Sequence, residues 1–392
     1  MRLMRLVHLA DYGGTYPGSF IPMVRAVLDG GRRRGWDVEA VFSEVAHDRI
    51  WLSELREEGF ACRLAPSGRG AVAQTVAEMV KGDRPTILHT HFTAFDLSAA
   101  RAARRHNQVI AYWHLHSALR SGAWWQLRNA LKLGLLSRGI EQILCVAPNI
   151  LDQARRRLGP QDRLVLVPNA IDLARFPLIT AERRREARQT LSLPQDAQVV
   201  LHFGWDWHRK GGDVLMEAIA SLIERDDMGK LVAITVAGEQ EAKASVGSLG
   251  VGEHVRVVAP SDNVQMLYAA ADVFVSPSRG EGHPFAVAEA LACGLPVVAS
   301  PIPGHEMIAE ATEGCQLVEL DSSSLAEAIA ATLELSAGDR EHQRLNARDW
   351  VVKELDIAAW SDRMLERYEG ALASQSSPEP RRHSGSSGRE SV

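Results

Sequence analysis

Two glutamates that stand eight residues apart, Glu281 and Glu289, are the side chains best placed for chemistry in this sequence. Glu281 falls in a polar, glycine-containing segment, whereas the neighbours of Glu289 are apolar on every side. A carboxylate is seldom buried without a partner. Glu289 is therefore expected to bind the hydroxyls of a ligand. The alternatives are a core salt bridge for Glu289 and a charge at the start of a helix for Glu281.

The segment that must position both glutamates is 273–300, VFVSPSRGEGHPFAVAEALACGLPVVAS, which predicts a strand, a loop, a helix and a second strand. Its two ends are short β-branched runs, typical of buried parallel strands. Pro284 suits the first helical turn, where its missing N–H costs nothing, and Gly294 suits the residue after the helix. The free backbone N–H groups at 283–285 then indicate a site for an anion.

The stretch EGHPFAVAEALACGLPVV resembles the Glu-x7-Glu signature of the retaining, nucleotide-sugar-dependent glycosyltransferases with the GT-B fold, of the group 1, family 4-like type. In that family the first glutamate meets the donor sugar and the second meets the ribose, roles that the resemblance gives to Glu281 and Glu289. It also implies an α/β fold with two Rossmann-like, doubly wound parallel sheets facing each other across a cleft. The other donor-binding residues expected in this loop are Gly282, His283, Pro284 and Phe285.

A lysine further upstream has the spacing that the family uses to neutralise the donor diphosphate. Lys210 follows Gly204 by six residues, which matches that spacing, but the arginine that normally follows the glycine is Trp205 here. Arg209 is therefore expected to supply the second cation. Positive charge is needed because the leaving diphosphate gains negative charge as the glycosidic bond breaks. The alternative for Lys210 is an ordinary surface lysine.

The first strand, predicted at 3–9, leads into a loop with a pair of glycines, Gly13 and Gly14. The pair does not form the GxGxxG fingerprint of dinucleotide-binding proteins. The resemblance implies that both glycines approach the donor phosphates. The alternative is a tight turn that needs a positive φ.

Two further predicted strands, at 86–91 and 109–117, carry four histidines toward their carboxyl ends. Open α/β sheets bind ligands at the carboxyl ends of their strands, so His89, His91, His114 and His116 are candidates for a site, with satisfied core histidines as the alternative. The resemblance assigns His114 to the donor sugar near the reacting carbon, with His116 as a nearby alternative. The expected catalytic residues are thus His114, Lys210 and Glu281, and His91 and His116 are expected to bind the acceptor.

Charge is divided unevenly along the chain. Residues 1–172 contain 23 Lys and Arg against 16 Asp and Glu, whereas the whole chain has a net charge of −5. On a predicted helix within 117–137, Trp125, Arg128 and Lys132 share one face, which suits contact with an anionic or lipid-linked acceptor, with ordinary packing as the alternative. We therefore expect Trp125 and Arg128 to bind the acceptor. No nucleic-acid motif accompanies the positive charge.

Strands and helices alternate in both halves of the 392 residues, which predicts two doubly wound domains. The expected division is 1–176 for the acceptor, 177–355 for the nucleotide sugar, 356–373 for a C-terminal helix crossing back to the first domain, and 374–392 for a disordered tail. No apolar run could span a bilayer, and no signal peptide is evident. The four cysteines show no CxxC pair or zinc spacing. A cytoplasmic protein is expected, with possible peripheral contact at the inner face of the membrane.

These patterns predict transfer of a hexosyl sugar, with retention, from a nucleoside-diphosphate sugar to a hydroxyl acceptor such as a glycan, a glycolipid or a small-molecule glycoside. No carboxylate pair with metal spacing is visible, so no metal and no cofactor are expected, and Lys210 together with helix N-termini is expected to stabilise the leaving group. The alternatives are a sugar-nucleotide epimerase of the same fold and a catalytically degenerate binding subunit. Trp205 in place of arginine motivates the second alternative.

Overall fold

A computed structural model describes residues 4–117, 131–134, 136–158, 162–224, 230–237, 239–261 and 263–376 of the chain. Its first half forms a seven-stranded parallel sheet in the order β3-β2-β1-β4-β5-β6-β7. The strands are β1 (Arg5–Ala10), β2 (Asp37–Ser43), β3 (Ala61–Ala65), β4 (Thr86–His91), β5 (Val109–Leu115), β6 (Ile140–Cys145) and β7 (Leu164–Leu166). Apolar clusters cover both faces of the sheet, as the near-continuous apolar runs of its strands require.

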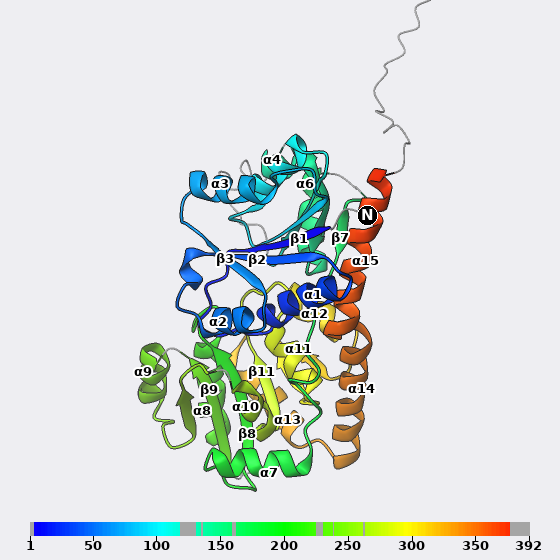
Figure 1. Ribbon diagram of the computed structural model, residues 1–392. Coiled ribbons are helices and arrows are strands. Elements are labelled where there is room, and N and C mark those ends of the chain that lie inside the picture. The colour runs from blue at the N-terminus through cyan, green and yellow to red at the C-terminus, as the bar shows by residue number, and fades with distance from the viewer. Residues whose placement is uncertain are drawn as a thin grey trace, which may run out of the picture.

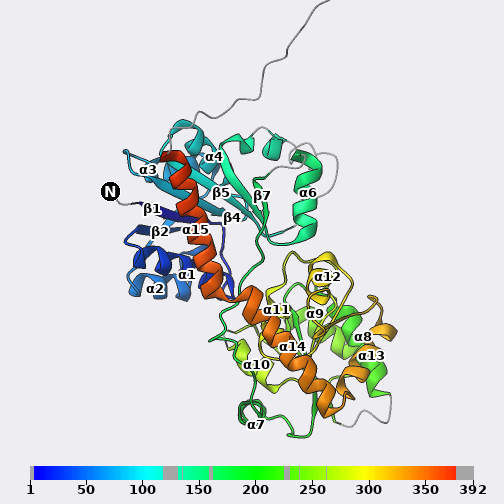
Figure 2. The same ribbon diagram turned by 90° about the vertical axis from the view of Figure 1, so that its right-hand side faces the viewer.

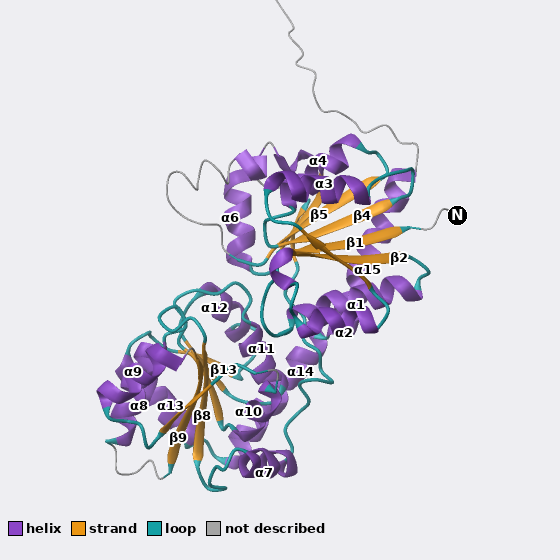
Figure 3. Cartoon of the chain, turned by 60° about the vertical axis from the view of Figure 1, so that its left-hand side comes forward, coloured by secondary structure: helices purple, strands orange, loops and turns teal. Residues whose placement is uncertain are grey.

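The second half forms a six-stranded parallel sheet in the order β10-β9-β8-β11-β12-β13. The strands are β8 (Gln198–Gly204), β9 (Leu231–Ala237), β10 (Val255–Val258), β11 (Val273–Ser276), β12 (Val297–Ala299) and β13 (Cys315–Leu317). Figures 1 and 3 show the two sheets as the centres of two separate domains, each with helices on both faces. The predicted pair of Rossmann-like parallel-sheet domains is confirmed.

Helices connect the strands in both domains. In the first they are α1 (Phe20–Arg33), α2 (Ile50–Glu57), α3 (Arg69–Met79), α4 (Asp96–Arg105) and α6 (Pro148–Leu158), with short 3-10 turns η1 (Glu44–Ala46) and η2 (Leu136–Gly139). In the second they are α7 (Ala181–Thr190), α8 (Gly212–Ile223), α9 (Glu239–Leu249), α10 (Val264–Ala270), α11 (Phe285–Ala292), α12 (Pro303–Ala309), α13 (Ser322–Leu333) and α14 (Ala337–Leu355), followed by α15 (Ile357–Ser376). Among the described residues, none of these helices combines the length and apolar composition that a membrane span needs.

Helix α15 leaves the second domain and packs against α1 of the first (Figure 2). Helices α14 and α15 are separated at Asp356 (φ −58°, ψ 126°), close to the predicted start of the C-terminal helix at 356. There the N–H of Ile171 donates to the carbonyl of Leu355 (2.7 Å), and the N–H of Ile357 donates to the carbonyl of Ile171 (3.1 Å). These bonds replace the helical ones where the chain passes between the domains. Helix α15 continues to Ser376, and 377–392 lie outside the described residues.

Leu365→Ala is expected to lower the free energy of unfolding by about 2–5 kcal/mol, the usual cost of truncating a leucine in a core. Leu365 is fully buried on α15, against Gly30 of α1. Denaturant unfolding measures the change. The matched control is Leu345→Ala on α14, where the side chain is 45% exposed. Equal losses in both variants would contradict the view that α15 stabilises the first domain.

Candidate active site

A buried ion pair lies at the carboxyl edge of the second sheet. Lys210 follows β8 and Glu281 follows β11, and these two strands are parallel neighbours, so their loops meet at one edge. The Lys210 Nζ lies 2.6 Å from the Glu281 Oε1, and Lys210 is only 7% exposed. Burial lowers the pKa of Lys210, and the Glu281 carboxylate acts in the opposite direction. The alternative of an ordinary surface lysine is therefore wrong.

Gly211 fixes the backbone that presents Lys210. Its φ is +69°, in the left-handed region, and a side chain there would overlap the carbonyl oxygen of Pro277 in the loop after β11. A glycine at this position therefore allows the loops after β8 and β11 to approach closely enough for Lys210 to contact Glu281.

Arg209 joins the same carboxylate. Its Nη1 lies 3.3 Å from the Glu281 Oε1 and donates to the carbonyl of Gly280 (3.2 Å). Trp205, which occupies the usual arginine position, is 52% exposed, and its ring centroid lies 4.4 Å from the Lys210 Nζ. Trp205 thus holds Lys210 by a cation–π contact, while Arg209 brings the second cation to Glu281.

Glu289 is 6% exposed on α11, where it contacts two hydroxyl groups. The hydroxyl of Ser19, at the start of α1 in the other domain, donates to one carboxylate oxygen, and the hydroxyl of Tyr268 on α10 donates to the other at 2.8 Å. Burial raises the pKa of Glu289, and both hydrogen bonds act in the opposite direction. Neither Ser19 nor Tyr268 can be recognised from the sequence as a partner of Glu289, and a serine before a helix is normally only a capping residue.

The loop before α11 is one of the places where the two domains touch. Pro284 caps the helix, and a side chain at Gly282 would overlap the carbonyl oxygen of His116 in the first domain. The Asn169 side chain donates to the backbone carbonyl of His283 (3.0 Å). His283 is 4% exposed, burial lowers its pKa to about 4, and neither ring nitrogen has a partner within the described part of the chain. Buried polar atoms normally have partners, so the imidazole of His283 is available to a ligand.

Gly13 and Gly14 lie in the loop after β1, packed against side chains of their own domain. The Arg49 and Trp51 side chains donate to their carbonyls at 3.0 and 2.9 Å. Neither glycine has a left-handed φ, so the tight-turn alternative is wrong. Side chains at these positions would crowd Val45 and the Tyr12 ring. Contact with donor phosphates remains a prediction for both.

Strand β5 ends at Leu115, slightly before the predicted 117, and it contains His114, which is fully buried with its Nε2 3.4 Å from the carbonyl of Val167. Contact between His114 and the donor sugar remains a prediction. The half-buried residue that follows the strand is His116, whose carbonyl packs against Gly282. His116 therefore fits the position next to the second domain better than His114. His91 is also buried, with its Nδ1 3.0 Å from the His116 Nε2.

Of the predicted interfacial helix, Trp125 and Arg128 lie outside the described residues. Lys132 is described, and its placement on a membrane-facing surface is wrong. Its ammonium pairs with the buried carboxylate of Asp96 and lies 5.1 Å from the Trp113 ring centroid. An inward-facing lysine of this kind cannot contribute to a lipid-binding face.

Two parallel α/β domains, with a lysine–glutamate pair at the carboxyl edge of the second sheet, define the GT-B class. The chain belongs to the group 1, family 4-like glycosyltransferases of this class. A family model described as "Glycosyltransferase Family 4" matches residues 23–175, and one described as "Glycosyl transferases group 1" matches residues 197–334. The resemblance carried by the Glu-x7-Glu segment is thereby confirmed.

The individual relatives found by sequence comparison are also named as glycosyltransferases. A D-inositol 3-phosphate glycosyltransferase of Actinosynnema mirum is 33% identical over 198 residues, 47% of this chain and 46% of that protein. The putative teichuronic acid biosynthesis glycosyltransferase TuaC of Bacillus subtilis is 29% identical over 245 residues, 62% of this chain and 60% of that protein. The chain thus spans about half the length of the curated relatives it matches.

Solved structures share the whole fold. A glycosyltransferase from Rickettsia africae matches with a TM-score of 0.79 at 16% identity, covering 95% of this chain and 99% of that one. Anabaena HepE in complex with UDP and glucose matches with a TM-score of 0.77 at 20% identity, covering 94% and 100%. The GT-B architecture therefore extends over nearly all of the chain.

Proposed function

We propose that the protein transfers a sugar from a nucleoside-diphosphate sugar to a hydroxyl acceptor, with retention at the anomeric carbon. The observation that carries this proposal is the convergence of Lys210 and Arg209 on Glu281, beside the start of α11. Family membership supports the reaction class, and the UDP bound by HepE supports a nucleotide-sugar donor.

Each group in the site has a role in this reaction. Lys210, Arg209 and the free N–H groups at the start of α11 hold the diphosphate and stabilise the charge that it gains as the bond to the sugar breaks. Glu281 orients those cations and meets the donor sugar. The Glu289 carboxylate accepts hydrogen bonds from the ribose hydroxyls. These bonds replace, or are added to, the bond that the Ser19 hydroxyl donates to it in the free protein. His283, buried without a partner in the described structure, faces the same ligand.

The acceptor in this proposal is an anionic hydroxyl compound that the first domain binds. Residues 1–172 carry the excess of basic residues. Two relatives have names that mention anionic compounds, an inositol phosphate and a teichuronic acid. The His116 carbonyl packs against Gly282, in the loop before α11. We therefore assign His116 to the place where the donor sugar and the acceptor meet.

The proposal is tested by thermal-shift measurements with a panel of nucleotide sugars, starting with UDP-glucose, followed by product analysis with inositol phosphate and inositol as acceptors. We expect one nucleotide sugar to raise Tm and the phosphorylated acceptor to give more product. Conversion of the donor without any acceptor would indicate an epimerase instead. Binding of a nucleotide sugar without turnover of any donor would indicate a catalytically degenerate binding subunit, and absence of both binding and turnover would contradict the proposal.

Excess EDTA is expected to leave transfer activity unchanged, because Lys210 and Arg209 supply the positive charge that a divalent ion supplies to the diphosphate in metal-dependent enzymes. Initial rates with and without EDTA, well below Tm, measure the effect. A control with added Mg²⁺ or Mn²⁺ should give the same rate. Loss of activity that either ion restores would contradict the prediction.

A further inference from the structure

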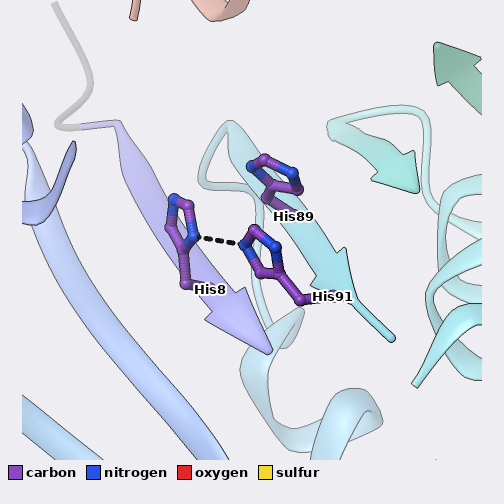
Figure 4. Close-up of side chains that lie close together, drawn as sticks. All are labelled: His8, His89 and His91. Carbon is purple, nitrogen blue, oxygen red and sulfur yellow. Dashed lines mark hydrogen bonds between the residues drawn. The ribbon is translucent and has the colours of Figure 1, made fainter. Parts of the chain in front are cut away.

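Three histidine side chains gather on one face of the first sheet, under α1 and α15. His89 and His91 are two residues apart on β4, so their side chains point to the same face. His8 on β1 pairs directly with His89 in the parallel register. Figure 4 shows the three rings turned toward one another from the two strands. The sequence indicates the His-x-His pair but not the third ring, which is more than 80 residues away.

Ring nitrogens of these residues lie within reach of a single ion. One nitrogen from each ring lies within 4.8 Å of one nitrogen from each of the others, and the His8 Nδ1 lies 3.0 Å from the His91 Nε2. Zinc–nitrogen bonds of about 2.0–2.1 Å place tetrahedral ligand atoms roughly 3.3–3.5 Å apart. Small rotations of the rings about their side-chain bonds bring the nitrogens to that spacing.

The three imidazole rings are neutral and can therefore act as metal ligands. All three side chains are at most 1% exposed. Burial lowers the pKa of His8 to about 3 and the pKa values of His89 and His91 well below the usual 6.5, and the neighbouring histidines act in the same direction. The imidazoles are therefore neutral at neutral pH, the form that binds metals.

Some ring nitrogens of these three histidines have no hydrogen-bond partner in the described parts of the chain, and others are bonded to residues outside the group. The Nε2 atoms of His8 and His89 are buried and have no partner in the described parts of the chain, which is uncommon for buried polar atoms. The outer nitrogens of two of the rings do have partners: the His89 Nδ1 contacts the Tyr368 hydroxyl, and the His91 Nδ1 lies 3.0 Å from the His116 Nε2. Metal-binding histidines characteristically use the second ring nitrogen in this way.

We propose that His8, His89 and His91 bind a divalent transition-metal ion of the zinc type, with a water as fourth ligand. Imidazoles without carboxylates favour such an ion over Mg²⁺ or Ca²⁺, which prefer oxygen. The ion links β1 to β4 and, through Tyr368, to α15. This site is separate from the Lys210–Glu281 pair and does not depend on the proposed sugar transfer.

A second group, His91, His114 and His116, shares one ring with the first. The first group is preferred because it leaves the His91 Nδ1 bonded to His116 as an outer partner, whereas the second uses His116, which packs against the donor loop. The two groups are distinguished by His8 and His114, each of which belongs to only one of them.

The test measures binding of Zn²⁺ by calorimetry, and of Co²⁺ by its visible absorption, to the full chain after removal of metals. We expect one ion per chain and a rise in Tm on adding Zn²⁺. His8→Asn removes the imidazole ring of one proposed ligand. It should therefore weaken binding by more than the roughly 10–100-fold that loss of an outer partner costs. Tyr368→Phe, which removes only the outer hydroxyl, should weaken binding by about 10–100-fold.

His342→Gln is the matched control, because His342 is a histidine whose side chain is 70% exposed on α14. It should bind Zn²⁺ and Co²⁺ as the wild type does. Three outcomes would overturn the proposal: no binding by the wild type, equal binding by wild type and His8→Asn with both folded by circular dichroism, or loss of binding in His114→Asn with His8→Asn unaffected.

Discussion

The Lys210→Ala variant is expected to lower kcat for sugar transfer about 10²–10³-fold, the usual effect of removing one preorganised group that stabilises a developing negative charge. The Lys210 ammonium is buried, lies 2.6 Å from Glu281, and sits where the diphosphate departs in the proposed reaction. This loss corresponds to about 2.7–4 kcal/mol of transition-state stabilisation. Steady-state kinetics at saturating donor measure the loss in kcat. A defect in donor affinity alone would not lower the rate at saturating donor.

Lys230→Ala is the matched control, because it makes the same substitution in an exposed ion pair. The Lys230 Nζ lies 2.7 Å from Asp196, and the two side chains are 62% and 67% exposed. Such pairs contribute only about 0–1 kcal/mol to stability, so kcat and Tm should stay near the wild-type values. A normal kcat for Lys210→Ala would remove Lys210 from the reaction.

Glu289→Gln is expected to lower kcat/KM about 10–100-fold while raising Tm near neutral pH. A hydrogen bond to a charged group contributes about 1.5–3 kcal/mol, and the amide cannot replace the carboxylate as acceptor of two hydroxyl bonds from the donor. In the free protein the carboxylate is buried with only the Ser19 and Tyr268 hydroxyls as its described hydrogen-bond donors, so neutralising it removes an unfavourable buried charge. A gain in stability with a loss of activity is typical of a functional position.

The stability gain should depend on pH in a defined direction. Burial raises the pKa of Glu289 above its ordinary value of 4.5. The folded state then holds the proton more tightly than the unfolded state, so the wild type loses stability as pH rises from 4.5 through the folded pKa. The difference in Tm between Glu289→Gln and wild type should be small at pH 4 and grow in favour of the variant between pH 4.5 and pH 8.

Glu327→Gln is the control for this variant, since Glu327 is exposed on α13. Its activity should be normal and its Tm difference from the wild type should not change with pH. A lower Tm for Glu289→Gln at pH 8, with normal kcat/KM, would show that Glu289 is a structural residue.

Local signals in the sequence predict the segments that hold the site. Strand β11 forms the start of the predicted 273–300 segment, and α11 begins directly after Pro284, because proline and β-branched residues limit the backbone within a few residues. The spacing of Lys210 from Gly204 likewise places the lysine in the turn after β8, beside Glu281.

The partners of these residues could not be predicted, because they come from distant parts of the chain. Ser19 contacts Glu289 from 270 residues away, and His8 meets His91 only because β1 and β4 are neighbours in the sheet. The exact end of β5 could not be predicted for a different reason. The end of β5 depends on pairing with β6, which continues to Leu115, and pairing is not visible in the composition of the strand.

The crossing of α15 has a consequence for the order in which the domains fold. The first sheet is complete at Leu166, yet its core also contains Trp360, Leu365 and Tyr368 from the end of the chain. Domains generally fold as units during synthesis, starting from the N-terminus. Here the apolar surface under α15 stays uncovered until those residues leave the ribosome, by which time all strands of the second domain have been made. The domain that is synthesised first is therefore the one that completes its core last.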